Sequence, residues 1–271
     1  MVRSLWSAAS GMKGQQTSVD TIANNLANVN TTGYKAQNAQ FKTLLYQTLQ
    51  SKSTNAQGDT KPTAAQVGLG TRVASLNSNF TQGAQLANDS NTAMCIIGEG
   101  FFAVQDGTET HYTRNGNFSW AINDAGEKVL TTPEGYQVLD QANQPIKVPK
   151  TVEKDFKVDP DTGAITIQNA DGKYTATGQS VAIYQFTNRV GLNKIGENLY
   201  DESEASGEPM PEWSTQGVIR SEVVQNYLEG SNVNVADEMV NLIIAQRAYE
   251  MNSKAITTSD TMLEQANNLK R

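Results

Sequence analysis

Residues 2–35 read VRSLWSAASGMKGQQTSVDTIANNLANVNTTGYK and carry a seven-residue apolar repeat. The repeat is made of four apolar residues and of the residue that follows each of them by three: Leu5, Met12, Val19 and Leu26, then Ala8, Gln15, Ile22 and Val29. This is the a/d pattern of the narrow stripe through which helices wind together. Asn30-Thr31-Thr32-Gly33 follows, and glycine there supplies the left-handed turn that ends a helix. The stretch predicts a long N-terminal helix that needs a partner helix.

A matching stripe stands at the other end of the chain. It consists of residues spaced by seven and of three supporting residues: Val235, Leu242, Tyr249, Ile256 and Leu263, then Met239, Ala245 and Ala248. A helix from about Val235 to Leu269 would be about 50 Å long at 1.5 Å per residue. The sequence therefore predicts an α+β fold, in which the two terminal helices form a coiled-coil-like domain.

Glycines and asparagines weaken the N-terminal helix. Gly11 and Gly14 each cost about 1 kcal/mol relative to alanine, either as a tolerated weakness or because a neighbouring backbone passes close. Asn24, Asn25 and Asn28 are poor helix formers, yet their side chains can also bond across to other helices and fix the register. Since such a helix is marginal alone, its order must come from packing.

Between the helices, residues 93–215 show the signals of a β domain. Asp106-Gly107 and Asn115-Gly116 stand at hairpin positions between strand-like runs. The predicted strands include Phe101–Val104, Lys128–Leu130, Tyr136–Leu139, Ile146–Val148, Ala164–Ile167 and Val181–Phe186. Short strands with turns about every ten residues indicate a central all-β domain of the sandwich or barrel type.

These signals divide the chain into five regions. They are the N-terminal helix (1–35), an extended connecting region (36–92), the central β domain (93–215), a returning connector (216–234) and the C-terminal helix (235–271). Within the connecting region, residues 47–66 form a polar insertion whose composition is typical of a flexible linker.

Composition and charge exclude several classes of protein. With 18% charged and 38% hydrophobic residues, the chain is neither a disordered tail nor a membrane protein. Residues 1–50 carry a net charge of +3, residues 51–234 carry −9 and residues 235–271 carry −1. An acidic middle argues against a nucleic-acid partner. The N-terminal region contains no apolar segment of the kind found in signal peptides, so we expect no secretory signal peptide.

Residue types that carry chemistry are scarce. One histidine, His111, excludes a paired-imidazole metal site, and one cysteine, Cys95, excludes a thiolate cluster and an internal disulfide. Cys95 stands in an apolar run, which favours a buried, inert thiol over a reactive one. Gly98-Glu99-Gly100 precedes a strand instead of a helix, so it is not a phosphate loop. We therefore expect no enzymatic activity, no cofactor and no metal.

Several motifs resemble those of the bacterial flagellar rod and hook family. They are ANNLANVNTTGYK at residues 23–35, GEGFFAV at 98–104, SNVNV at 231–235 and QRAYE at 246–250. They occur in the same order as in that family, at both ends and in the middle. Within the family, the likeness is greatest to distal rod subunits, through RSLW at 3–6, LYQT at 45–48, VGLGT at 67–71 and IGENLY at 195–200.

The resemblance implies a structural role in an axial tube, with the terminal helices inside and the β domains outside. It implies a homo-oligomer in the form of an open helical polymer, a rigid hollow drive shaft that transmits torque from motor to hook. The implied partners are other flagellar rod and hook axial proteins, a surrounding basal-body ring acting as a bushing, and the flagellar export apparatus. The implied location is the rod of the basal body, crossing the periplasm, reached without a cleaved signal peptide.

We expect the assembly interface to lie on the two terminal stripes. Its predicted residues are Leu5, Met12, Val19, Ile22, Asn25, Leu26, Asn28, Val29, Val235, Met239, Leu242, Tyr249, Ile256 and Leu263. We also hypothesise that residues 47–66 become ordered against neighbouring subunits and stiffen the tube.

Two alternatives remain open. One is a proximal rod or hook subunit of the same family, although the 47–66 insertion argues against the hook. The other is an extracellular, β-rich, carbohydrate-active or tail-fibre-like protein. That class would explain the strands and turns but not the paired terminal repeats.

Overall fold

The computed structural model describes residues 2–50, 65–123, 126–148, 156–168, 174–215 and 217–269. The chain forms two compact units. We call residues 1–27, 37–78 and 234–271 the helical unit, and residues 28–36 and 79–233 the β unit. No helix in the described part of the chain is long and apolar enough to cross a membrane.

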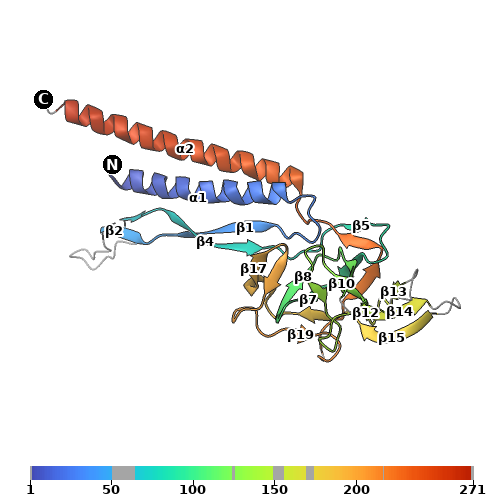
Figure 1. Cartoon of the computed structure of the whole chain (residues 1–271). Helices are drawn as coiled ribbons and strands as arrows, with labels where there is room; N and C mark the ends of the chain where they lie inside the picture. Colours follow the sequence, from blue (N-terminus) through green and yellow to red (C-terminus); the bar gives the residue numbers. More distant parts are fainter. Residues whose placement is uncertain are drawn as a thin grey trace, which may run out of the picture. The chain divides into compact units, whose positions relative to one another are not determined.

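The helical unit contains both predicted terminal helices, α1 (Val2–Ala27) and α2 (Val235–Asn268), and they run antiparallel (Figure 1). Its other elements are paired strands: β1 (Gln37–Thr43) with β4 (Thr71–Ser78), and β2 (Tyr46–Gln50) with β3 (Ala65–Gly68). Helix α1 packs along α2 and also against β1 and β4, so it lies between them (Figure 1). Because α1 is covered on two sides, its order comes from packing, as the weak helix requires.

The helix ends differ in detail from the prediction. Helix α1 stops at Ala27, and Gly33 adopts a φ of +70° six residues later, in the β unit. A side chain at Gly33 would place its Cβ 2.7 Å from the backbone nitrogen of Asn115, so this glycine permits a close chain crossing. At the start of α2, Asn234 is the N-cap, and its side chain accepts a hydrogen bond from the backbone nitrogen of Ala236.

The connecting region predicted over residues 36–92 is divided between the two units, since 37–78 belongs to the helical unit. Of the polar insertion 47–66, residues 51–64 lie outside the described residues. The described residues on either side form β2 and β3, which pair antiparallel with Tyr46 opposite Gly68.

The β unit is built on a sheet whose main path runs β12-β10-β11-β7-β8-β18-β17. These strands are β12 (Lys147–Val148), β10 (Lys128–Thr131), β11 (Gln137–Val138), β7 (Phe101–Asp106), β8 (Glu109–Thr113), β18 (Leu199–Asp201) and β17 (Asn193–Gly196). Three more join it beside this path: β9 (Ser119–Ile122), β16 (Ile183–Gln185) and β19 (Met210–Pro211).

Smaller sheets complete the β unit. They are β13 (Phe156–Val158), β14 (Ala164–Gln168) and β15 (Tyr174–Ser180) in one; β6 (Met94–Ile97) with β20 (Glu222–Gln225); and β5 (Gln85–Ala87) with β21 (Tyr227–Glu229). A short 3₁₀ turn, η1 (Arg189–Gly191), precedes β17. The β-rich centre predicted from the turns is thus confirmed.

One predicted hairpin forms and the other does not. At Asp106-Gly107 the chain turns from β7 into β8, and Gly107 has a φ of +59°. The hairpin predicted at Asn115-Gly116 is wrong, because β8 pairs with β7 and β18 whereas β9 pairs with β10. A Cβ on Gly116 would overlap the carbonyl oxygen of Met94. The Asn-Gly pair therefore serves a close chain crossing instead of a turn between paired strands.

Two groups of side chains form the core of the β unit. The larger group is aliphatic and aromatic, with Phe102, Leu130 and Ile165 among its fully buried members. In the second group, Phe101, Tyr112, Phe186 and Tyr200 pack edge to face. Aromatic pairs of this geometry add stability beyond their buried area.

The candidate chemical groups of the sequence lie in this fold as structural residues. Cys95 is completely buried on β6, and burial raises the pKa of its thiol to about 11, so the expectation of an inert thiol is confirmed. His111 lies buried on β8, with its Nδ1 2.5 Å from Oδ1 of Asp201.

Candidate assembly surface

The contact between α1 and α2 repeats every seven residues on both helices. Ser4 Oγ lies 3.2 Å from Ser259 Oγ, a Cβ on Gly11 would lie 2.9 Å from Nδ2 of Asn252, and Asn25 Nδ2 lies 3.3 Å from Oε1 of Glu238. The numbers rise by seven and then by fourteen along α1, while they fall by seven and then by fourteen along α2. The helices are therefore antiparallel and share one register over nearly their whole common length.

These three contacts are made on α1 by the small or polar residues Ser4, Gly11 and Asn25, each one residue before the predicted stripe. The coiled-coil character expected from the apolar a/d pattern is not confirmed, because glycine, serine and asparagine stand where large knobs would have to insert.

The strand pairs β1–β4 and β2–β3 are called the ribbon below. Asn25 holds the start of the ribbon, at β1, against α1. It is completely buried, and its Oδ1 accepts a hydrogen bond from the backbone nitrogen of Gln37 at 2.9 Å. Its Nδ2 donates to the Gln37 carbonyl at 2.9 Å and to Glu238. Burial raises the pKa of Glu238, the Asn25 hydrogen bond lowers it and the charge of Asp237 raises it further. Asn25 thus bonds across to another helix, as one interpretation of the asparagines predicts.

The helical glycines lie where other elements come close. Besides Gly11 against Asn252, a Cβ on Gly14 would lie 3.1 Å from Cε1 of Phe41 on β1. The interpretation that a neighbouring backbone passes close is wrong, because the nearest atoms at both glycines belong to side chains. Each glycine creates the space that a partner on one side of α1 fills.

The predicted interface residues are distributed over three environments. Ile22 and Asn25 are buried inside the helical unit. Partly buried in the helical unit are Leu5, Met12, Val19, Leu26, Leu242, Ile256 and Leu263, and partly buried in the β unit are Asn28 and Val29. Exposed on α2 are Val235, Met239 and Tyr249. The stripe therefore does not face a single partner.

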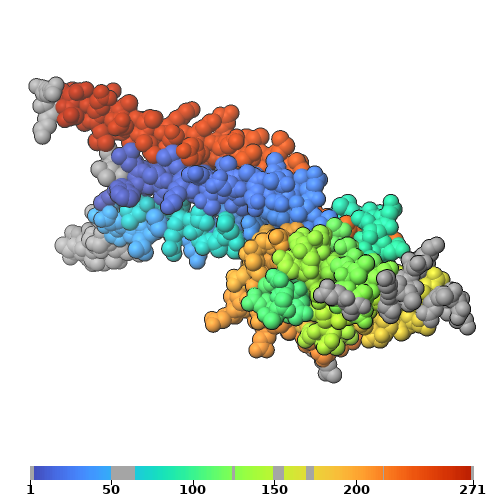
Figure 2. Space-filling model, in the orientation of Figure 1, coloured from blue at the N-terminus to red at the C-terminus, as the bar shows by residue number. Residues whose placement is uncertain are grey.

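Helix α2 also exposes apolar residues that the stripe does not include. Val240, Ile243, Ile244 and Met251 are 55%, 55%, 60% and 66% exposed. Figure 2 shows the side of α2 away from α1 uncovered, in orange to red. The signal was present in the sequence, because residues 239–245 are apolar except for Asn241 and so point around the whole helix. A helix that is apolar all round is one that is covered on all sides.

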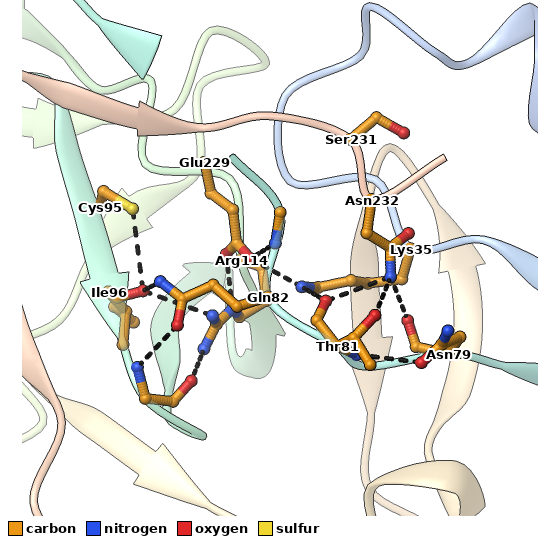
Figure 3. Close-up of polar contacts among 12 residues, drawn as sticks. Lys35, Asn79, Thr81, Gln82, Cys95, Ile96, Arg114, Glu229, Ser231 and Asn232 are labelled. Atoms are coloured by element: carbon orange, nitrogen blue, oxygen red, sulfur yellow. Dashed lines mark hydrogen bonds and ion pairs between the residues drawn. The ribbon is translucent and has the colours of Figure 1, made fainter. Parts of the chain in front are cut away.

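The β unit contains a buried ion cluster around Glu229 (Figure 3). Its Oε1 accepts from Nζ of Lys35 at 2.7 Å and from the Gly83 nitrogen at 2.9 Å, and its Oε2 accepts from Nε of Arg114 at 2.8 Å. The three charged side chains are 1–3% exposed. Arg114 also donates to the carbonyl oxygens of Gly98 at 2.9 Å and Gly100 at 2.5 Å. Every charge is thus paired and hydrogen-bonded, as burial demands.

The pKa values in this cluster follow from burial and pairing. Burial lowers the pKa of Lys35, and the negative charge of Glu229 only partly opposes it. For Glu229, burial acts to raise the pKa, but the charges and hydrogen bonds of Arg114 and Lys35 outweigh it and hold the pKa below its ordinary value. The Glu229 carboxyl group is therefore ionised at neutral pH.

Asn232 ties the same region together. Its Oδ1 accepts from the Ala36 nitrogen at 2.8 Å, and its Nδ2 donates to the carbonyl oxygens of Asn79 at 2.7 Å and Thr81 at 3.1 Å (Figure 3). The sequence motifs ending at Lys35 and starting at Ser231 are thus joined in the β unit. No pattern in the sequence predicts this cluster. The only signal is that the charged residues Lys35, Arg114 and Glu229 lie in or near the family motifs and the Asn-Gly pair.

No group of three or more histidine, cysteine, aspartate or glutamate side chains in the described ranges is placed to hold a metal ion. Exposed large apolar side chains of the helical unit lie on the outer side of α2, on α1 at Trp6 and on the ribbon at Leu45, Tyr46 and Leu49.

Comparison with known proteins identifies the family to which this chain belongs. Residues 5–35 match the family described as flagella basal body rod protein, residues 95–176 match the flagellar hook protein FlgE/F/G D1 domain, and residues 224–269 match the flagellar basal body rod FlgEFG protein C-terminal family. Over its full length the chain is 42% identical to the flagellar basal-body rod protein FlgG of Borreliella burgdorferi, and the match covers all of that protein. The chain belongs to the flagellar basal-body rod protein family.

Other members support this assignment and sharpen it. The flagellar basal-body rod protein FlgG of Bacillus subtilis is 38% identical, with 100% of both chains covered. By contrast, the flagellar hook protein FlgE of Borreliella burgdorferi is 41% identical over 51% of this chain and 36% of its own length. The expected likeness to the distal rod branch is thus confirmed. As a member of this family, the chain is a structural subunit of the flagellar rod.

The matched regions coincide with structural features of this rod protein. The family match over residues 5–35 covers most of α1 and ends at Lys35, and the match over residues 224–269 contains Glu229 and α2. The buried ion pair therefore joins the two terminal regions that define the family.

Proposed function

We propose that this rod subunit polymerises through its helical unit into an open helical, rigid and hollow shaft of the distal rod, which transmits torque from motor to hook. The observation that carries the proposal is the uncovered apolar side of α2. Four large apolar residues there are each more than half exposed in a single copy: Val240, Ile243, Ile244 and Met251.

An uncovered apolar surface favours assembly. Proteins that remain monomeric rarely expose contiguous apolar patches of this kind, and each buried apolar side chain contributes about 1.5–3 kcal/mol. Contacts between different surfaces of identical chains generate an open helical filament when the rotation between copies does not close into a ring. Because α1 already covers one side of α2, the opposite side is available to neighbouring copies.

The ribbon offers a second contact. Leu45, Tyr46 and Leu49 are 84%, 59% and 55% exposed. They lie at the described N-terminal end of the polar insertion 47–66, and a two-stranded ribbon is marginally stable alone. We propose that these side chains contact neighbouring subunits and that this contact stiffens the shaft. This extends the hypothesis that the insertion distinguishes a rod from a flexible hook.

The proposal includes partners and a route. The subunit would meet other rod and hook axial proteins at the ends of its polymer, would rotate inside a basal-body ring that acts as a bushing, and would arrive through the flagellar export apparatus. The net charge of −9 over residues 51–234 supports partners other than nucleic acid.

Electron microscopy of the purified full-length chain at increasing concentration tests the proposal. We expect straight hollow rods from the wild type and none from Ile244→Glu, because the added charge would have to be buried between copies. Ile219→Glu, at an 88% exposed position of the β unit, is the matched control and should form rods. A wild-type chain that stays monomeric, or rods of normal length from Ile244→Glu, would contradict it.

A further inference from the structure

Helix α1 carries an exposed tryptophan on its outer side. Trp6 is 70% exposed, and two basic residues, Arg3 and Lys13, are exposed within two turns of it. Tryptophan is among the residues that most often dominate the binding energy of protein interfaces. An indole left in water on a helix of an assembling protein is therefore a candidate anchor.

The same unit contains a groove between α1 and α2. Val19 and Tyr249 contribute its apolar surface, and Gln16, Gln246 and Glu250 complete the lining. Its volume is about 410 Å³, within the range of pockets that accept small organic groups. The groove thus offers an apolar floor and a polar rim, which suits an amphipathic ring such as indole.

Anchor and groove each carry a charge that the other can pair with. No acidic residue precedes Asp20 in the sequence, so the first part of α1 itself is basic, with Arg3 and Lys13 exposed. Helix α2 holds five acidic and two basic residues, a net charge of −3. At the groove, Glu250 Oε2 accepts from Nη1 of Arg247 at 2.8 Å, but both side chains are more than half exposed. Exposed pairs of this kind are weak, so Glu250 can exchange Arg247 for an arginine of another copy.

Trp6 cannot fill the groove of its own chain. It precedes Val19 by 13 residues on one rigid helix, a separation of about 20 Å. A second copy is therefore required. Since anchor and groove are different surfaces, copies joined in this way are arranged head to tail, the kind of contact from which open helical filaments are built.

We propose that Trp6 of one copy inserts into the groove between α1 and α2 of a second copy, where Arg3 approaches Glu250. This inference deepens the proposed function and rests on it, because it names the residues through which successive subunits join.

Cross-linking of two single-cysteine additions tests the contact directly. Full-length chains with Arg3→Cys and with Glu250→Cys, both of which keep Trp6, are mixed under assembly conditions and oxidised, and the buried Cys95 remains silent. We expect a disulfide-linked dimer in the mixture and not in either variant alone. Rods that form in the mixture without this cross-link would overturn the inference.

Truncation of the anchor gives a second test. Trp6→Ala should raise the critical concentration for rod formation by about tenfold or more, the usual effect of losing an interface anchor. Ile122→Ala, at an equally exposed position of the β unit, should leave it unchanged. Circular dichroism confirms that both variants fold. Assembly of Trp6→Ala at the wild-type concentration would refute the contact.

Exchange of charges separates this inference from the proposed function. Arg3→Glu and Glu250→Arg should each weaken assembly, and the double variant should recover most of the loss. If the wild type forms rods but the double variant shows no recovery, the contact is wrong while the proposed function stands. If the wild type never forms rods, both fail.

Discussion

The side-chain amide of Asn25 lies 3.3 Å from Oε1 of Glu238, across 213 residues of sequence. The same amide group bonds both backbone polar atoms of Gln37. One side chain therefore connects α1, α2 and the first strand of the ribbon, and it sets the register in which the small and polar residues of the two helices meet.

Loss of this amide should destabilise the helical unit. Asn25→Ala leaves the Gln37 backbone groups and the Glu238 carboxyl group without these partners in a buried place, at a cost of about 2–3 kcal/mol. Urea unfolding followed by circular dichroism at 222 nm measures it. Asn241→Ala, at an exposed position of α2, has the same gain in helix propensity and should not lower the midpoint. Equal midpoints for the two variants would contradict the role of Asn25.

Enlarging Gly14 should separate helix propensity from packing. For Gly14→Ala, the helical gain of about 1 kcal/mol offsets a small shift of Phe41, whose ring lies 3.1 Å from the added Cβ and is partly free to move. Gly14→Leu has no such space and should destabilise by about 1–3 kcal/mol. Thermal unfolding of both variants checks this, with Ala9→Leu on the exposed side of α1 as the control. A Gly14→Leu variant as stable as Ala9→Leu would show that β1 does not pack there.

The sequence predicted where the two helices lie, but it did not predict which residues of one element contact the next. The seven-residue spacing located both helices, because periodicity depends on the helix itself. The apolar stripe includes Leu5 and Met12, and contacts to α2 are also made by Ser4 and Gly11, one residue earlier. Small and polar residues add no apolar signal, so the hydropathy pattern does not predict contacts of this kind.

The same limit applies to turns and to the ion cluster. Asn115-Gly116 has the local signature of a hairpin, but the carbonyl of Met94 occupies the space beside Gly116, a contact from another strand. Lys35 and Glu229 meet across 194 residues. Burial of that pair is a property of the tertiary fold, and no local pattern encodes it.

Acid should destabilise the β unit through Glu229. The pKa of this carboxyl group is held below its ordinary value of 4.5 in the folded chain, so its contribution to the free energy of unfolding is complete above about pH 4.5 and is lost as the pH falls through the lower, folded-state pKa. Urea midpoints between pH 3 and 7 measure the slope. Glu229→Gln should be less stable by about 3–5 kcal/mol at pH 7, because two buried cations lose their counter-charge.

The slope of that profile decides whether Glu229 is responsible. Glu229→Gln should show a flatter decline below pH 4.5 than the wild type. Glu222→Gln, at an exposed position of β20, should keep the wild-type slope. Identical slopes for the wild type and Glu229→Gln would assign the acid sensitivity to other groups.

Two glycines of the β unit should respond very differently to alanine. Gly116→Ala forces a Cβ onto the Met94 carbonyl, a backbone atom that cannot move aside, and we expect a severe loss of several kcal/mol. Gly107→Ala meets nothing within 4 Å and pays only for its φ of +59°, about 1–2 kcal/mol. Near-ultraviolet circular dichroism and thermal unfolding compare the two. A mild effect at Gly116 would show that the Met94 carbonyl does not pass close to this position.

A charge at Leu26 should separate assembly from folding of the β unit. Leu26 is partly buried on the last turn of α1, within the helical unit through which we propose that copies join. Leu26→Arg brings a bulky cation into apolar packing that has no acidic partner designed for it, so rods should be absent in sedimentation and electron microscopy. The near-ultraviolet spectrum should stay intact, because the packed aromatic group of Phe101, Tyr112 and Phe186 belongs to the β unit. Ile195→Arg, at an exposed position of β17, adds the same charge and should still assemble. If Leu26→Arg abolished the aromatic signal, the β unit would depend on the helices for its fold. The proposal that the helical unit mediates assembly while the β unit folds independently would then be wrong.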